Sequence, residues 1–345
     1  MIKLSKNRLS KIENKFKKFN VAIIGDMMLD GYLWGDVNRI SPEAPVPIVE
    51  IDKEFFRFGG AANVALNIAK LGGNAIPFGI LGDDENATIF KSLIAEEKME
   101  GKFLLTDQSR PTTTKTRVIS SDQQIVRIDK ESKSKISTKI ETKLFELLKE
   151  NIKNIDAIIL EDYNKGVLTK SLITKIIDLA NSENIIVTVD PKFENFFNYK
   201  NVTVFKPNLK ETEDSFGIKL NNTSDIEEIG FKLLNKIQSR YILLTLGADG
   251  MAIFEQGKGM KIIPTKARKV LDVSGAGDTV ISTLTMSLLA GASILEATYL
   301  ANFAGGMVCE EAGVVPIELN KLFSQLNSEL EWRTFWFQEK ILLRL

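Results

Sequence analysis

The stretch Leu271-Asp-Val-Ser-Gly-Ala-Gly-Asp-Thr-Val280 holds two glycines and then opens a long run of small and apolar residues. Glycine lacks a Cβ atom, so Gly275 and Gly277 let the backbone turn tightly and lie close to a ligand. The run that follows predicts a helix, whose first N–H groups lack intrahelical acceptors and carry partial positive charge. The sequence therefore predicts a phosphate site at this turn.

A carboxylate, Asp278, lies at the mouth of this predicted anion site. Because a bound phosphate would repel it, its position indicates a base that takes a proton from a hydroxyl as the hydroxyl attacks phosphorus. An aspartate at a helix start is also a common cap, and Gly-x-Gly alone is a weak signal. From these residues alone, both interpretations of Asp278 stay open.

The composition excludes several other kinds of chemistry. The 345 residues include one cysteine, Cys309, and no histidine, which excludes an intrachain disulfide and every histidine-based triad, general base or metal site. Lysine plus arginine equals aspartate plus glutamate, so no net field attracts nucleic acid or a membrane surface. There is no apolar run of about 18 residues that would span a membrane. The lysine-rich first 20 residues lack a secretory apolar core, and we expect a cytoplasmic enzyme.

Alternating strand and helix patterns predict an α/β fold with a doubly wound, mostly parallel sheet and helices on both faces. Short apolar runs of the kind buried in parallel sheets occur at residues 21–25, 75–81, 157–160, 185–189, 202–205 and 241–245. Each run ends in glycine or polar residues. Since ligands bind beyond the carboxyl ends of such strands, this edge of the sheet is the predicted ligand site.

Two other segments predict a small β lid. Residues 36–52 contain three prolines, which favour an edge strand or a loop, and end in alternating apolar residues. Residues 112–119 are rich in β-branched side chains, and residues 124–129 alternate apolar with polar as a half-exposed strand does. We therefore expect one domain over residues 1–330, with lid strands from about 31–57 and 103–130. Residues 331–345 form an aromatic tail without assigned chemistry.

Polar residues and glycines near the first strand are candidate ligand contacts. Asp26 and Asp30 follow that strand directly and are placed to bind polar groups, although they would also cap a turn. Gly59 and Gly60 allow close backbone approach, and Asn63 offers both a donor and an acceptor, which suits sugar hydroxyls. A plain glycine turn with an asparagine in the following helix explains the same residues.

Three cations recur along the predicted lid strands. Lys115, Arg117 and Arg127 are more regular than a solvated strand face requires. They would clamp a second phosphate carried by the substrate. Ordinary surface charge is the alternative interpretation, and it is expected for at least one of them.

Several segments resemble, in the same order, the motifs of the ribokinase-like (PfkB) carbohydrate kinases. The similar segments are the string at 272–279, the sugar-binding motif at 59–63, the Asn-x-x-Glu element of Asn208 and Glu211, and a nucleotide-site loop at 245–250. The resemblance spans roughly residues 20–325. It implies a ribokinase-like fold and a sugar kinase.

The resemblance also implies roles for residues. In this family the last aspartate of the signature is the catalytic base and the preceding glycine-rich backbone holds the transferring phosphoryl group, which assigns these roles to Asp278 and to Gly275, Ala276 and Gly277. ATP and Mg²⁺ are the implied cofactors, with the metal held by Glu211 through water. A monovalent cation stays open. The implied nucleotide and cofactor contacts are Asn208, Glu211, Thr245, Gly247, Gly250 and Asn302.

A narrower resemblance is to the D-glycero-β-D-manno-heptose 7-phosphate kinases. It rests on residues 25–30, 39–47, 59–65, 123–129 and 162–166, and the string Ile-Ser-Pro-Glu-Ala-Pro-Val-Pro at 40–47 is the most specific part. It implies phosphorylation of the anomeric hydroxyl to the 1,7-bisphosphate, for ADP-heptose and lipopolysaccharide core synthesis. The implied sugar contacts are Asp26, Asp30, Asn63 and Asp162, and the implied 7-phosphate contacts are Arg39, Lys115, Arg117 or Arg127. Ser274 departs from the threonine of these kinases but keeps the hydroxyl.

Two alternatives stay open, namely a kinase of the same family for another sugar or sugar phosphate, and a non-catalytic sugar or nucleotide sensor on the same fold. An NAD-binding protein is disfavoured because no Gly-x-Gly-x-x-Gly follows the first strand. The expected partners are ATP, a sugar phosphate and a second copy of the chain paired through the lid strands. No nucleic acid or membrane partner is expected.

Overall fold

A central sheet of nine strands organises the part of the chain that the computed structural model describes, residues 4–121, 123–265, 270–311 and 313–342. Its spatial order is β13-β12-β11-β10-β9-β8-β1-β4-β5. The pairings are parallel except that β12 runs antiparallel to both neighbours. The strands are β1 (Asn20–Gly25), β4 (Asn74–Leu81), β5 (Leu104–Thr106), β8 (Ala157–Glu161), β9 (Ile186–Asp190), β10 (Val204–Phe205), β11 (Tyr241–Thr245), β12 (Met251–Glu255) and β13 (Lys261–Ile263).

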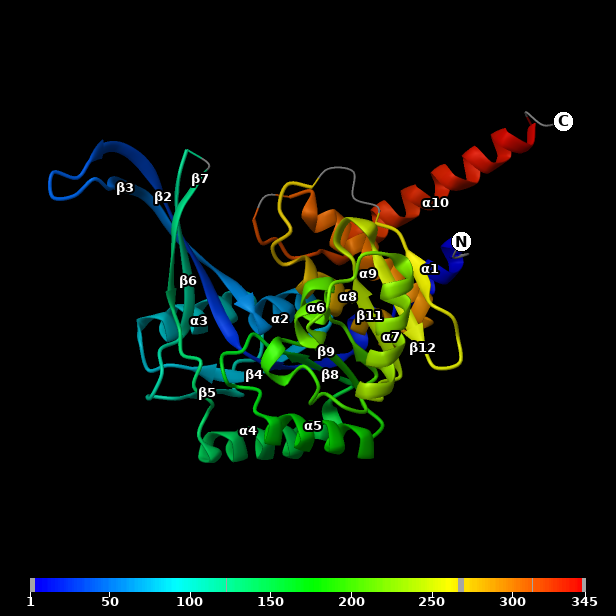
Figure 1. Cartoon of the computed structure of the whole chain (residues 1–345), viewed down its shortest axis with the longest axis horizontal. Coiled ribbons are helices and arrows are strands. Elements are labelled where there is room, and N and C mark those ends of the chain that lie inside the picture. Colours follow the sequence, from blue (N-terminus) through cyan, green and yellow to red (C-terminus); the bar gives the residue numbers. More distant parts are fainter. Residues whose placement is uncertain (1–3, 122, 266–269, 312, 343–345) are drawn as a thin grey trace.

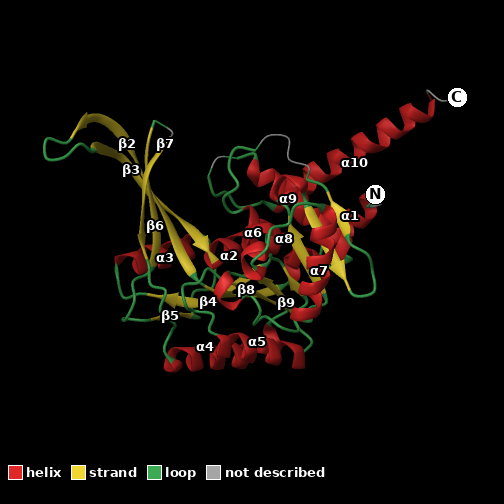
Figure 2. Cartoon of the chain, viewed as in Figure 1, coloured by secondary structure: helices red, strands yellow, loops and turns green. Residues whose placement is uncertain are grey.

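Helices cover both faces of this sheet (Figure 2). Alternate residues of β1 enter different apolar clusters, Val21 and Ile23 on one face and Ala22 and Ile24 on the other, because successive strand side chains point to opposite faces. The first cluster includes residues of α1 (Lys6–Glu13), α2 (Ala61–Lys70), α3 (Glu85–Glu96), α8 (Ala276–Leu289), α9 (Ile294–Cys309) and α10 (Leu319–Leu342). The second includes residues of α4 (Thr138–Asn151), α5 (Lys170–Ser182) and α7 (Thr223–Ile237), with α6 (Leu209–Phe216) at its margin.

A second sheet stands at one end of the first (Figure 1). Its order is β3-β2-β6-β7, from β2 (Met27–Ile40), β3 (Pro47–Gly60), β6 (Thr113–Ser120) and β7 (Gln123–Lys130). The lid therefore starts nearer β1 than expected, because β2–β3 pairing continues down to Met27 and Gly60. The expectation that the lid also includes residues from 103 onward is wrong for β5, which pairs parallel with β4 in the central sheet.

Strand β7 departs from its predicted half-exposed pattern. Residues of both faces are exposed, including Ile125 at 41%, Val126 at 48% and Ile128 at 54%. Alternation of apolar and polar residues predicts one buried face only if another layer covers it. As the edge strand of a sheet that stands away from the body, β7 has no such layer within the described chain.

The N-terminal segment lies beside the first part of α10, whose far end projects away from the body (Figure 1). Lys6 of α1 pairs with Glu331 of α10 at 2.5 Å, and the rings of Phe16 and Phe323 meet edge to face. The predicted tail is not a separate segment at residue 331, because α10 runs continuously to Leu342. Residues 343–345 and the side chains from 332 onward lie outside the description. No helix of the described chain is both long and apolar enough to cross a membrane.

Candidate active site

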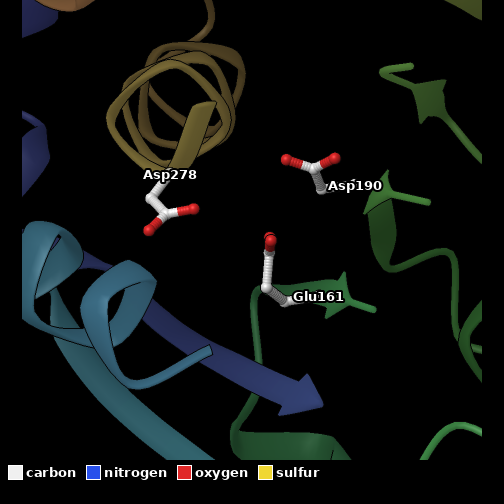
Figure 3. A group of neighbouring side chains, drawn as sticks. All are labelled: Glu161, Asp190 and Asp278. Carbon is white, nitrogen blue, oxygen red and sulfur yellow. The ribbon is translucent and has the colours of Figure 1, made fainter. Parts of the chain in front are cut away.

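The carboxyl ends of β8 and β9 and the first turn of α8 meet at one edge of the central sheet (Figure 3). Glu161 ends β8 and Asp190 ends β9, and the two are register partners. Asp278 enters from the first turn of α8. The sequence thus brings together a helix N-terminus and the ends of parallel strands, which is where open α/β sheets bind ligands.

The turn before α8 requires a glycine at position 275. Gly275 has φ +77°, and a Cβ there would lie 3.2 Å from the Asn63 side-chain nitrogen. A Cβ on Gly277 would lie 3.5 Å from Asp190 Oδ2 and 3.6 Å from Lys206 Nζ, so the backbone at Gly277 is in close reach of an ion pair. An anion bound at this amide would therefore lie beside the Asp190–Lys206 pair.

The predicted Gly-Ala-Gly anion site has fewer free backbone amides than the sequence suggested. Ala276 N–H donates to the Val273 carbonyl at 3.2 Å, so this amide is already engaged. The Thr279 N–H donates to the Gly275 carbonyl at 3.0 Å as the first turn of the helix closes. The amides of Gly277 and Asp278 come before that bond, so they lack an intrahelical acceptor. They are the amides that an anion would reach.

Asp278 is held by two donors and is 5% exposed. Asn63 Nδ2 donates to Oδ2 at 2.6 Å, and the Tyr163 hydroxyl donates to Oδ1 at 3.0 Å. Burial raises the pKa of Asp278 to about 6, and the nearby Asp190 charge adds to the rise while both hydrogen bonds oppose it. A carboxyl with a pKa near neutral is suited to accept a proton and release it again.

A series of ion pairs connects Asp190 with Glu211. Lys206, which is 3% exposed, pairs with Asp190 Oδ2 at 2.7 Å. Lys192 lies 3.7 Å from Asp190 Oδ1 and 2.5 Å from Glu211 Oε1. Burial opposes the charge on Lys192, but the carboxylates of Asp190 and Glu211 outweigh it and raise the pKa of Lys192. Both lysines are therefore cations placed beside the helix N-terminus.

The Asn-x-x-Glu element forms the N-terminal cap of α6. The Asn208 side chain accepts from the Glu211 N–H at 2.7 Å, and Glu211 Oε2 accepts from the Asn208 N–H at 2.9 Å. This reciprocal pair is a capping box, and it fixes both side chains. Each Glu211 oxygen thus has one partner, Lys192 Nζ at Oε1 and the Asn208 N–H at Oε2.

The predicted nucleotide residues lie along the next strand end, but they differ in what they do. Thr245 forms an isolated parallel β-bridge with Asn208. Gly247 has φ +61°, and a Cβ added to it would have no atom within 4 Å. Gly250 is structural, since a Cβ there would lie 2.0 Å from the Ile263 carbonyl. Asn302 donates to the Pro264 carbonyl at 2.7 Å. Gly250 and Asn302 thus shape the loop and do not present free groups to a ligand.

Two predicted sugar contacts, Asp26 and Asp162, are buried and already bonded within the chain. Asp26 is 1% exposed, and its carboxylate accepts from the backbone amides of residues 163, 165 and 167. Asp162, also 1% exposed, accepts from the Tyr199 hydroxyl at 2.6 Å, the Asn195 amide and the Asn164 N–H. Their oxygens hold the loop after β8 in place. Strand-end position predicted a polar role but not the direction of each side chain.

Other predicted sugar and phosphate contacts share one face of the lid. Asp30 pairs with Arg117 Nη1 at 2.7 Å, and a Cβ on Gly59 would lie 2.7 Å from Asp30 Oδ2. Gly60, at φ +55°, begins α2. Lys115 opposes Asp30 in register, and Arg127 opposes Arg117. Directly opposed residues point to the same face, so these four charged side chains lie on one side of the lid.

This face of the lid faces Tyr163 and, through it, Asp278, the predicted base. Lys115 Nζ lies 5.5 Å from the centre of the Tyr163 ring, and Lys192 Nζ lies 5.1 Å from it. Tyr163 in turn donates to Asp278. Arg57, which the sequence analysis did not select, opposes Asp30 in register and lies over the Tyr32 and Phe55 rings. The lid thus presents Lys115, Arg117 and Arg57 near the catalytic edge.

Arg39 does not lie with these cations. Its side chain is 66% exposed in the outer part of the β2–β3 hairpin and pairs with Glu50 at 3.6 Å. Figure 1 shows that this hairpin extends away from the central sheet. Within one copy of the chain, the structure therefore does not bring Arg39 together with the other lid cations. Its contact with substrate phosphate stays a prediction.

Five residues of the site were not selected from the sequence: Tyr163, Glu161, Asp190, Lys192 and Lys206. A signal was present, since each ends a buried strand or follows one within two residues. That rule marks whole segments of polar residues. It cannot say which side chains point toward α8, because α8 begins at least 70 residues further along the chain.

The fold and this edge define a ribokinase-like enzyme that transfers a phosphoryl group to a sugar hydroxyl. The chain belongs to the pfkB family of carbohydrate kinases, whose family model matches residues 18–320. The predicted fold is confirmed by a solved structure of Arabidopsis thaliana ribokinase complexed with ribose and ATP. It has a TM-score of 0.70 and 18% identity, and the likeness covers 88% of this chain and 98% of that one.

Two relatives carry the name bifunctional protein HldE. The Campylobacter curvus protein is 40% identical over 91% of this chain and 67% of its own length. The Desulfatibacillum aliphaticivorans protein is 40% identical over 91% of this chain and 64% of its own length. The chain thus spans about two thirds of the curated relatives it matches.

Proposed function

We propose that this chain transfers the γ-phosphoryl group of ATP to the anomeric hydroxyl of D-glycero-β-D-manno-heptose 7-phosphate, giving the 1,7-bisphosphate for ADP-heptose and lipopolysaccharide core synthesis. Membership of the kinase family supports the reaction type. The motifs at residues 25–30, 39–47 and 123–129, together with relatives named HldE, support the sugar. The observation that carries the proposal is the placing of Asp278 beside the free amide of Gly277.

The chemical step uses these two groups. Asp278 takes the proton of the anomeric hydroxyl while the hydroxyl oxygen forms a bond to the γ-phosphorus and the bond from that phosphorus to the β,γ-bridging oxygen breaks. ADP leaves with the electron pair of that bond. The Gly277 amide and the partial charge at the start of α8 stabilise the phosphoryl oxygens as charge moves onto them. Asn63 and Tyr163 keep the base in one orientation.

The lid supplies the proposed sugar-phosphate contacts. Arg117 is held in place by Asp30, and Lys115 lies over Tyr163, so both are oriented before substrate arrives. Burial lowers the pKa of Lys115, and the neighbouring Lys165 charge adds to the effect. A bound phosphate dianion would raise this pKa again, because a nearby negative charge favours the charged form of lysine. Arg127 is paired with Asp129 and more exposed, which makes it the outer contact.

The nucleotide and metal contacts are also proposals. Lys192 and Lys206 would contact ATP phosphates, and the loop of Thr245 and Gly247, where a Cβ on Gly247 would meet nothing, would contact the rest of the nucleotide. Mg²⁺ supplies charge neutralisation on the phosphates when bound, and Glu211 would orient it through water, as the resemblance to the kinase family implies. Whether a monovalent cation contributes stays an open part of the proposal.

A homodimer paired through the lid belongs to the same proposal. The lid exposes large apolar side chains, among them Trp34, Ile40, Ile51, Val126 and Ile128. Exposed edge strands with apolar side chains commonly pair with a second copy. Light scattering coupled to gel filtration would test this. A mass of one chain at micromolar concentration would contradict the dimer and leave the kinase proposal intact.

The proposed activity is tested by ADP release with Mg-ATP against D-glycero-D-manno-heptose 7-phosphate, fructose 6-phosphate, fructose 1-phosphate, ribose and ketodeoxygluconate. We expect kcat/KM for the heptose phosphate to exceed the others by at least tenfold. Preference for another sugar would overturn the substrate and keep the reaction. Absence of turnover on all five would support a sugar or nucleotide sensor instead.

A further inference from the structure

Three carboxylates converge behind the phosphoryl site (Figure 3). Glu161 and Asp190 are register partners on neighbouring parallel strands, so both side chains leave the sheet on the same face. Asp278 reaches the same point from α8. One oxygen of each carboxylate lies within 4.8 Å of the other two, and all three residues are buried.

Glu161 differs from the other two because it has no hydrogen-bond partner. It is 0% exposed, and neither of its carboxylate oxygens is bonded to any part of the described chain. Asp190 pairs with Lys206, and Asp278 accepts from Asn63 and Tyr163. In Figure 3 the Glu161 side chain points between Asp190 and Asp278. A buried carboxylate without donors is unfavourable unless it is protonated or binds a cation.

The local charge balance favours a cation. Within this group the carboxylates of Glu161, Asp190, Asp278 and Glu211 face the ammonium groups of Lys192 and Lys206. If all are ionised, two negative charges remain without compensation. Lys192 and Lys206 are committed to Asp190 and Glu211, so neither lies in hydrogen-bond contact with Glu161. One divalent cation would balance the group.

We propose that Glu161 and Asp190 bind a hard divalent cation of the Mg²⁺ or Mn²⁺ kind before the nucleotide arrives, with an oxygen of Asp278 within reach. Carboxylate oxygens are the ligands that such ions prefer. Ligands across Mg²⁺ are about 4.2 Å apart and those across Ca²⁺ about 5 Å apart. The three carboxylate oxygens lie within 4.8 Å of one another, so a small closing movement would let them share one such ion.

The proposed site adjoins the phosphoryl site. An ideal Cβ on Gly277 would lie 3.5 Å from Asp190 Oδ2, so a cation on Asp190 would lie near the amide that is proposed to bind the phosphoryl oxygens. It is held by carboxylates of the protein, whereas the proposed metal at Glu211 is held through water. Binding without nucleotide therefore distinguishes the two sites.

The test is a Mn²⁺ titration of the full chain without nucleotide or sugar, following free Mn²⁺ by electron paramagnetic resonance. We expect one Mn²⁺ per chain, displaced by Mg²⁺. Glu161→Gln keeps the size of the side chain and should weaken binding at least tenfold. Glu141→Gln is the matched control, because Glu141 is also buried but pairs with Thr169 and Lys175 away from the cluster. It should bind as the wild type does.

A second measurement needs no variant. Millimolar Mg²⁺ should raise the Tm of the nucleotide-free wild type above its value in KCl at matched ionic strength. Absence of saturable Mn²⁺ binding, unchanged binding in Glu161→Gln, or an equal rise of Tm with K⁺ would each overturn the proposal and indicate that Glu161 carries a proton or a monovalent ion. Since neither sugar nor ATP is present, the result does not depend on which sugar the enzyme phosphorylates.

Discussion

The Tyr163 hydroxyl donates a hydrogen bond to Oδ1 of Asp278 across 115 residues of sequence, at 3.0 Å. This contact joins the loop after β8 to the first turn of α8. Burial raises the pKa of the Tyr163 hydroxyl well above its usual value, and the Asp278 charge adds to the rise, so the hydroxyl stays protonated and remains a donor. Lys115 and Lys192 lie over the same ring. Tyr163 therefore links the base to cations from the lid and from the central sheet.

Removing this donor should disturb the base without removing it. We expect Tyr163→Phe to lower kcat about tenfold with little change in the KM for ATP, because a hydrogen bond to a charged group is lost. The bond favours the ionised form of Asp278, so its loss raises the pKa of Asp278. The acid limb of the pH profile of kcat/KM, which reports the free enzyme, should move to higher pH. A lower kcat with an unmoved acid limb would contradict a role through Asp278.

Replacing the base should nearly abolish turnover. Asp278→Asn keeps the shape and loses the proton acceptor, which should lower kcat by about 10²–10⁴-fold. ATP binding, measured by calorimetry, should change little. Asp178→Asn, an exposed aspartate on α5, is the control. If Asp278→Asn kept full activity, another group would have to accept the proton.

The wild-type pH profile should show the same group. Asp278 has a pKa of about 6 in the folded protein, so its ionised fraction falls as the pH drops below 6. Because only the ionised form accepts a proton, kcat/KM, which reports the free enzyme, should fall about tenfold per unit at lower pH. Steady-state rates between pH 4.5 and 8, with ADP release as the readout, would check this. A flat profile down to pH 5 would exclude a base of this pKa.

Asp26 should matter for stability rather than for sugar recognition. Its carboxylate accepts three backbone N–H groups of the loop at 163–167. An asparagine there cannot accept all three bonds, since an NH₂ group, which donates, replaces one of the two carboxylate oxygens. Asp26→Asn should therefore lower the free energy of unfolding by about 1–3 kcal/mol. Chemical denaturation would measure it, with Asp178→Asn as the comparison. An unchanged stability with a raised sugar KM would restore Asp26 as a substrate contact.

Substitution of a lid cation should affect the KM for the sugar phosphate only if that cation lies near the site. Arg117 is half-buried and faces the site, whereas Arg39 lies out on the hairpin. Arg117→Met should raise the KM for the sugar phosphate about tenfold or more, because a charge-assisted contact to phosphate is lost. Arg39→Ala should leave KM near the wild-type value. Equal effects of the two changes would mean that a second copy of the chain brings Arg39 to the site.

Most of the fold could be predicted because its signals are local. The apolar runs at 21–25 and 241–245 mark buried strands by their own composition, and Gly275 marks a turn that only glycine adopts easily. The predictions failed where the position or burial of a segment depends on which other segment it packs against. Residues 104–106 join the central sheet because β4 offers a free edge, and β7 stays exposed because no layer covers it.

The sequence by itself determined the α/β architecture, the turn before α8 and the position of Asp278 at a helix start, since each depends on residues that are neighbours in the chain. Only the tertiary structure decided how the carboxylates divide their roles. Asp26 and Asp162 hold a loop, whereas Glu161 and Asp190 face Asp278. What a buried carboxylate does depends on which donors surround it, and those donors come from segments far apart in the sequence.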